Sequence, residues 1–236
     1  MKHYFLAITL FFSGFLFSQT SYNDSIKLNE VIVTGSKTEI SRKIVPLSVS
    51  QISKTNIENS GQMNILTALN QFAPGIFVTE RNIFGFGVST GGSGSISMRG
   101  MGGTPNNEVL VMIDGHPQYQ GIFGHPLADA YVSSDVEKVE IIHGPASILY
   151  GSNAMAGVIN IITKKQKTDG MSATLGTSYG SYNTQKYYGT FGFKDKKLNA
   201  FASANYSHTD GIREKTDFNI GNGYLKVGYD INEHLS

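Results

Sequence analysis

The sequence contains no cysteine and little charge. Without cysteine the chain cannot form a disulfide, a thiolate zinc site or an iron–sulfur cluster, and it has neither a cysteine nucleophile nor a lipoprotein anchor. Charged residues make up only 16% of its 236 residues, and the formal net charge is +1. Because nucleic-acid binding depends on a marked basic excess, this composition argues against a nucleic-acid partner.

Glycine and aromatic residues are abundant instead. The chain has 27 glycines, 12 tyrosines and 14 phenylalanines, and 40% of its residues are hydrophobic. Average proteins contain roughly 7% glycine. Low charge with many aromatic residues argues against a disordered chain or a helical bundle, so the composition favours strands joined by turns.

The first 18 residues have the pattern of a secretory signal peptide. Lys2 and His3 precede an apolar run over residues 4–17, and Ser18 follows it. This run is about 14 residues long, whereas a membrane-spanning helix needs roughly 20. We therefore expect residues 1–18 to direct export and to be cleaved after Ser18.

The pattern of the remaining chain changes near residue 170. N-terminal to residue 170, the apolar residues of the segment 64–72 have the spacing of a helix. The other runs there are typical of strands, at residues 28–34, 45–52, 76–79, 95–99, 109–113, 136–142 and 158–163. This mixture predicts a compact α+β domain with long loops, one of them glycine-rich over residues 85–103. After it, residues 171–180, 184–193, 198–208 and 223–231 form runs of about the 9–11 residues that a transmembrane β-strand needs. These runs alone fit a membrane barrel and a soluble antiparallel meander equally well.

Four segments together resemble the plug of a TonB-dependent outer-membrane receptor. They are residues 30–34 (EVIVT), residues 64–78, the pair of residues 97–100 and 109–115, and residues 135–164 (DVEKVEIIHGPASILYGSNAMAGVINIITK). The last segment is similar to the family pattern over some thirty positions, which makes it the most specific of the four. The resemblance implies a mixed sheet with short helices and long loops, followed by antiparallel strands of an incomplete transmembrane β-barrel.

The resemblance also implies the domain organisation. Residues 1–18 are the signal peptide, residues 19–39 a flexible segment with the TonB box, residues 40–165 the plug, and residues 170–236 the first four strands of a truncated barrel. The TonB box comprises Glu30, Val31, Ile32, Val33 and Thr34, which can pair edge-on with a strand of TonB. Family barrels close with about 22 strands, so we expect this chain to be an N-terminal fragment that does not transport by itself.

Ten residues stand at motif positions of the plug. Nine of them match the family pattern, and one departs from it. They are Arg99, Gly100, Asp114, Gly115, Glu140, His143, Gly144, Pro145, Tyr150 and Gly151. The family usually carries arginine where this chain has His143. Arginine is permanently charged, whereas histidine titrates near neutrality. If the family arginine contacts acidic groups on the barrel wall, that contact is weaker or pH-sensitive here.

Several methionine, histidine and aromatic residues are candidate cargo contacts. They are Met98, Met101, His116, Tyr119, Phe123 and His125. Thioether sulfur prefers Cu(I), and imidazole accepts copper, zinc or haem iron. The alternative interpretation places Met98 and Met112 in the core and the histidines on surface loops. The sequence therefore defines no metal site and no bound cofactor.

The resulting functional prediction is a receptor for TonB-energised uptake of a scarce nutrient, most commonly an iron chelate (a siderophore) or haem, in the outer membrane of a Gram-negative bacterium. Copper or cobalamin uptake is an alternative. The expected partners are TonB, outer-membrane lipid and the cargo. The chain has no H-E-x-x-H or P-loop motif. The G-x-S-x-G pattern occurs in the glycine-rich loop (residues 87–91) and at the end of a strand-like run (residues 176–180), but neither match is followed by the helix that a nucleophile elbow needs, so we predict that the chain is not an enzyme. Two rival predictions remain: an exported binding protein that transports nothing, and a partial coding sequence without a function.

Overall fold

The structure is a computed structural model that describes residues 31–32, 40–41, 47–79, 95–103, 108–118 and 130–229. The predicted signal peptide and most of the segment over residues 19–39 lie outside these ranges. The chain from Val31 onward clusters as one unit. No helix in the described ranges is long and apolar enough to span a membrane.

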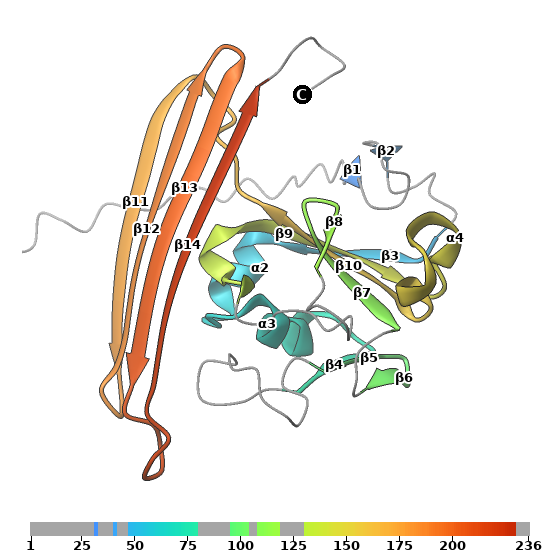
Figure 1. Ribbon diagram of the computed structural model, residues 1–236, viewed down its shortest axis with the longest axis horizontal. Coiled ribbons are helices and arrows are strands. Elements are labelled where there is room, and N and C mark those ends of the chain that lie inside the picture. The colour runs from blue at the N-terminus through green and yellow to red at the C-terminus, as the bar shows by residue number, and fades with distance from the viewer. Residues whose placement is uncertain are drawn as a thin grey trace, which may run out of the picture. The chain divides into compact units, whose positions relative to one another are not determined.

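A five-stranded mixed sheet forms the centre of the α+β part (Figure 1). Its order is β3 (Val49–Ser53), β9 (Val136–His143), β10 (Gly157–Thr163), β7 (Val109–Ile113) and β8 (His116–Pro117). Only β10 and β7 run parallel. Side chains on both faces of β7 and β10 are buried, which explains why these strands read as continuous apolar runs. The predicted mixed sheet is confirmed.

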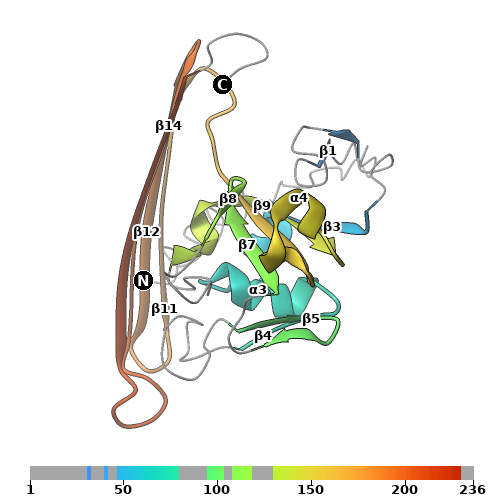
Figure 2. The ribbon, with the colours of Figure 1, turned by 45° about the vertical axis from the view of Figure 1, so that its right-hand side comes forward.

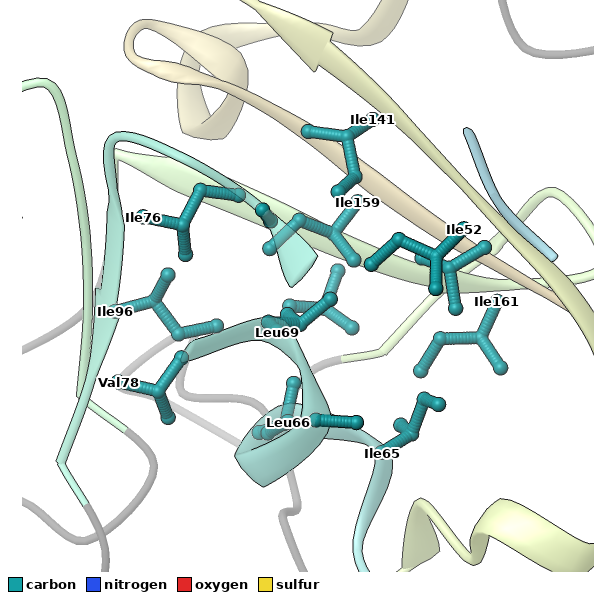
Figure 3. Packing of buried hydrophobic residues seen from close by; sticks show 14 of the residues in the cluster. Ile52, Ile65, Leu66, Leu69, Ile76, Val78, Ile96, Ile141, Ile159 and Ile161 are labelled. Atoms are coloured by element: carbon teal, nitrogen blue, oxygen red, sulfur yellow. The ribbon is translucent and has the colours of Figure 1, made fainter. Parts of the chain in front are cut away.

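Helix α3 (Ile65–Phe72) covers one face of this sheet, and a small antiparallel sheet packs beside α3 (Figure 2). The small sheet contains β4 (Ile76–Val78), β5 (Ile96–Met98) and β6 (Met101–Gly103). Leu69 of α3 lies toward Ile159 in Figure 3, and Leu66 belongs to the same buried cluster. The apolar positions at helical spacing therefore form the buried stripe that the sequence predicts.

The ends of α3 follow from local chemistry. The Asn64 side chain accepts a hydrogen bond from the Leu66 N–H at 2.8 Å and caps the first turn. Gly75 then adopts a positive φ of 83°, a conformation in which glycine has no steric penalty. The sequence did not predict helix α2 (Lys54–Asn59), the single-turn helix α4 (Ser147–Tyr150) or the 3-10 turns η5 (Ser133–Asp135) and η6 (Ser152–Ala154). These elements are too short for a periodic apolar pattern to develop.

Four long antiparallel strands form a separate sheet. They are β11 (Gly170–Gly180), β12 (Thr184–Asp195), β13 (Leu198–Thr209) and β14 (Phe218–Tyr229), each paired with its neighbour in sequence. The sheet is open, because neither the free edge of β11 nor that of β14 is paired within the described residues. The expected sheet order is confirmed, but β14 begins five residues before the predicted run. Asn219, Gly221 and Gly223 share its outer face, and their weak hydrophobicity hid the alternation.

A short antiparallel pair lies before the plug sheet. Strand β1 (Val31–Ile32) pairs with β2 (Ile40–Ser41), with Val31 opposite Ser41 and Ile32 opposite Ile40. Strand β1 is the only described part of residues 19–39, the segment in which the sequence places the TonB box.

Candidate functional site

The predicted TonB-binding residues are described only in part. Val31 and Ile32 form β1, whereas Glu30, Val33 and Thr34 lie outside the described ranges. A short extended strand with β-branched side chains can add to the edge of a partner sheet. In this structure one edge of β1 is occupied by β2.

The Arg99–Gly100 pair forms the turn between β5 and β6. Both residues have positive φ, 53° for Arg99 and 83° for Gly100. The Arg99 N–H donates to the Gly75 carbonyl oxygen at 2.7 Å and ties this turn to the end of α3. Glycine at the second position suits the left-handed backbone, so the Arg-Gly motif has a structural reason.

His143 ends β9 and is anchored to the strand before α2. Its Nε2 lies 2.7 Å from the Ser50 Oγ, and its N–H donates to the Ser48 carbonyl oxygen at 2.8 Å. Its buried Nδ1 has no hydrogen-bond partner among the described residues. Burial lowers the pKa of His143, and the positive charge of Arg99 lowers it further. The imidazole therefore favours its neutral form, where the family arginine would place a permanent charge.

Glu140 and Tyr150 are linked electrostatically. Glu140 is fully buried in β9, and its Oε1 lies 2.6 Å from the Lys138 Nζ. Burial raises the pKa of Tyr150, and the negative charge of Glu140 raises it further. Glu140 is therefore paired with Lys138, and its charge also acts on the Tyr150 hydroxyl.

The Gly144–Pro145 segment and α4 shape the connection from β9 to β10. Gly144 and Gly151 have φ of 111° and 88°. The Gly144 N–H donates to the Ala156 carbonyl oxygen at 3.0 Å, and the Tyr150 N–H donates to the Ala146 carbonyl oxygen at 3.0 Å. This part of the longest motif is a folded turn, in which glycine supplies backbone conformations that other residues adopt rarely.

Asp114 and Gly115 form the predicted tight turn between β7 and β8, with φ of 49° and 81°. The Asp114 Oδ1 accepts from the Thr163 N–H at 2.9 Å, and Oδ2 accepts from the Thr163 Oγ1 at 2.5 Å. The Lys226 Nζ on β14 lies 2.8 Å from the same Oδ2. Burial raises the pKa of Asp114, but the hydrogen bonds from Lys226 and Thr163 outweigh it and hold the pKa below its ordinary value.

Lys226 is the functional candidate that the sequence prediction missed. The alternation over residues 223–231 does place Lys226 on the polar face of its strand, together with Tyr224. That face points toward the plug, because both side chains reach Asp114. A lysine on the inner face of a strand was the available signal, but the sequence gave no means to identify its partner.

A second contact joins the plug to the long-stranded sheet. The Ser134 Oγ of η5 donates to the Asn205 Oδ1 of β13 at 2.7 Å. The neighbouring Asp135 is buried, and burial raises its pKa although the Ser134 Oγ donates to its Oδ1 at 3.2 Å. A cavity of about 420 Å³ lies between these contacts, and Asp114, Asp135 and Tyr224 are among its lining residues.

The candidate cargo contacts separate into three groups. Met98 is 1% exposed and belongs to the core, so its assignment as a cargo contact is corrected: β4 and β6 pair with its strand and the core covers its side chain. Met101 is 50% exposed, and His116 is exposed on β8. Tyr119, Phe123 and His125 lie outside the described residues. Within the described ranges, no group of three or more His, Cys, Asp or Glu side chains could hold a metal ion.

Comparison with a family model identifies the α+β part. Residues 41–158 match the model described as TonB-dependent Receptor Plug Domain. Among curated proteins, the iron-regulated outer membrane virulence proteins of two Vibrio cholerae serotype O1 strains are each 33% identical over 171 residues. The match covers 69% of this chain and 24% of each relative, so the chain spans about a quarter of the length of the curated relatives it matches.

Comparison with solved structures supports the fold beyond the residues that the family model matches. The alcaligin outer membrane receptor FauA from Bordetella pertussis is similar with a TM-score of 0.67 and 22% identity, over 86% of this chain and 32% of that chain. The pyoverdine outer membrane receptor FpvA from Pseudomonas aeruginosa, bound to pyoverdine, has a TM-score of 0.67 and 19% identity, over 86% of this chain and 28% of that chain. At these identities the likeness shows a shared fold.

Proposed function

Because the chain belongs to the TonB-dependent receptor plug-domain family, we propose that it provides the plug and four wall strands of an outer-membrane receptor that takes up an iron chelate with energy from TonB. One joint observation carries this proposal: the plug model matches residues 41–158, and relatives whose names record iron regulation are 33% identical over 171 residues. A siderophore or haem is the proposed cargo class.

The outer face of the long-stranded sheet supports a place in the outer membrane. Leu175, Leu225 and Val227 lie on this face and are exposed, Leu175 to 88%. The residues that alternate with them, such as Ser203, Asn205 and Lys226, face the plug and are polar. Apolar side chains outside and polar side chains inside are typical of transmembrane barrels.

The proposed mechanism makes and breaks no covalent bond. The plug blocks the barrel at rest, and cargo binds on the outer side. Cargo binding favours a plug state in which residues 30–34 are available to TonB, which requires the two plug states to differ in cargo affinity. TonB then adds a strand to the TonB box and pulls on the plug.

The central test separates cargo binding from uptake. In cells that carry the receptor in their outer membrane, residues 28–35 are deleted, and binding and uptake of a radiolabelled iron chelate are measured. We expect binding to persist and uptake to fall to the level of cells that lack TonB. Uptake at the wild-type level would contradict the TonB-box assignment.

Substitutions at Val31 sharpen this test. Val31→Pro removes a backbone N–H that a β-addition partner would use, so uptake should fall while binding remains. Val31→Thr is the matched control, because it keeps a β-branched side chain and the N–H. Equal uptake by both variants would argue against strand addition at this residue.

Growth and fractionation tests address the rival functions. A strain that depends on this receptor is grown under iron limitation with a siderophore or with haem as the sole iron source, and with copper or cobalamin limitation in parallel. Rescue by cobalamin or copper alone would exclude iron uptake. Recovery of the receptor in the soluble periplasmic fraction would favour a non-transporting binding protein.

A further inference from the structure

One ion pair in the structure joins the plug to the long-stranded sheet. Lys226 of β14 donates to the Asp114 Oδ2 at 2.8 Å and to the Thr163 Oγ1 at 3.1 Å. The Tyr224 hydroxyl lies 3.3 Å from the Thr163 Oγ1 and 3.4 Å from the Asp114 Oδ2. We call these four side chains, Asp114, Thr163, Tyr224 and Lys226, the clasp.

The clasp is partly shielded from water. The Lys226 side chain is 32% exposed and the Asp114 side chain 20%. Exposed ion pairs contribute little to stability because water screens them. In a shielded pair, removing one partner leaves the other charge without compensation. Loss of the Lys226 charge should therefore weaken the attachment of Asp114 to β14 more than loss of an ion pair with a surface lysine would.

The clasp lies where two central strands of the plug sheet end. Asp114 lies in the turn after β7, and Thr163 is the last residue of β10, the strand that pairs parallel to β7. Residues 164–169 connect Thr163 directly to β11. Asp114 and Tyr224 also line the cavity of about 420 Å³ between plug and wall, so withdrawal of the turn from β14 would widen that cavity.

We propose that Lys226 is a positioning residue that holds the Asp114 turn against the wall at rest and releases it during transport. This inference rests on the proposed transport function, which it deepens by naming the wall contact that opens. The Ser134–Asn205 hydrogen bond is a neutral contact between the same two parts. The clasp differs from it in carrying a charge on each side, which makes its strength depend on Lys226.

A reversible cross-link tests whether the clasp opens. Residues 1–236 contain no cysteine, so Asp114→Cys with Lys226→Cys provides the only thiol pair within this part of the receptor. A short thiol-reactive linker with a reducible bond joins the two residues in receptor-bearing cells, and uptake and binding of the iron chelate are measured before and after reduction. We expect cross-linking to reduce uptake at least tenfold, reduction to restore it, and binding to remain unchanged.

The matched control places the same linker within the wall. Ser207 and Ile220 are register partners on β13 and β14, so Ser207→Cys with Ile220→Cys leaves the plug free, and uptake should persist. Uptake through the cross-linked clasp at the unlinked rate would overturn the proposal while leaving the transport function intact. Absence of TonB-dependent uptake in the wild-type receptor would instead refute the proposed function.

Removal of the charge gives a second readout that keeps Asp114. In cells without TonB, Lys226→Met should increase passive entry of a large antibiotic about tenfold, equivalent to about 1.4 kcal/mol in the closed-to-open equilibrium. Lys226→Arg should restore the barrier, because arginine can also bind the carboxylate. Lys194→Met is the control. Lys194 is a lysine of the same sheet, on β12, but its ammonium donates to the Lys167 carbonyl oxygen and not to Asp114. Equal entry in all three variants would refute a holding role for Lys226.

Discussion

Gly157 offers the sharpest test of how the longest motif works. It is the first residue of β10, between β9 and β7. A Cβ at this position would lie 2.3 Å from the Ile142 carbonyl oxygen and 2.4 Å from the Met98 Sδ. The thioether can move because methionine is flexible, but the carbonyl belongs to the paired strand and cannot move alone. Gly157→Ala should therefore strain the centre of the plug sheet.

The expected cost follows from this geometry. Ordinary contacts of a Cβ begin near 3.4 Å, so the β9 backbone would have to retreat by about 1 Å, while paired to β3 on its other side. Overpacking of a tight interior costs about 1–3 kcal/mol. Because a backbone atom is involved, we expect about 2 kcal/mol, which corresponds to about a 30-fold change in an equilibrium constant.

Hydrogen exchange in the detergent-solubilised receptor measures this effect. Amides of β9 and β10 should lose about 30-fold in protection in Gly157→Ala, since local opening becomes easier. Gly228→Ala is the control, because a Cβ there meets no atom within 4 Å. Adding Met98→Ala should recover only part of the loss. Unchanged protection of β9 and β10 in Gly157→Ala would refute the steric reasoning.

Two further predictions concern polar contacts. Asn70 accepts from the Val78 N–H at 2.8 Å and donates to the Val78 carbonyl oxygen at 3.0 Å, so Asn70→Ala should cost about 1–3 kcal/mol, seen as faster exchange at β4. Asn70→Asp should not recover this loss, because an ionised carboxylate can accept from the Val78 N–H but has no donor for the Val78 carbonyl oxygen. Burial lowers the pKa of His143, and the charge of Arg99 lowers it further. At a pH below the ordinary pKa of about 6.5, His143 therefore takes up a proton when the protein unfolds. Plug stability should fall as the pH drops from about 6.5, and His143→Gln should remove that part of the loss in melting curves between about pH 5 and 7.5. An identical pH dependence in His143→Gln would contradict this assignment.

The elements that the sequence predicted best are those whose burial is visible in their own residue pattern. Strands β7 and β10 are nearly continuous apolar runs because the sheet is covered on both faces. The early start of β14 was missed because Asn219, Gly221 and Gly223 carry little hydrophobic signal, although they pair with β13 in full register. Pairing with a neighbouring strand, which a single sequence does not display, extended this strand.

The residues of the candidate site also differ in whether the sequence alone predicts their role. The Asp114–Gly115 turn was predictable, because an apolar strand followed by Asp-Gly signals a tight turn. Its partner Lys226 was not, because 112 residues separate them and the contact depends on how the plug meets the wall. Met98 carried a misleading signal: its sulfur suggested a soft-metal ligand, but burial placed it over Gly157 in the core.

The difference between packing residues and exposed residues explains why the longest motif identifies the family but does not identify the cargo. Gly144, Gly151 and Gly157 in that motif satisfy backbone and packing requirements of the plug, and these requirements hold for any cargo. Exposed side chains such as Phe77 and Met101 lie on the small sheet, outside the motif. The motif therefore meets requirements of folding, and we expect the proposed choice of cargo to depend on other segments. An exchange of the segment over residues 135–164 between receptors should preserve cargo choice, and a change of cargo after that exchange would contradict this separation.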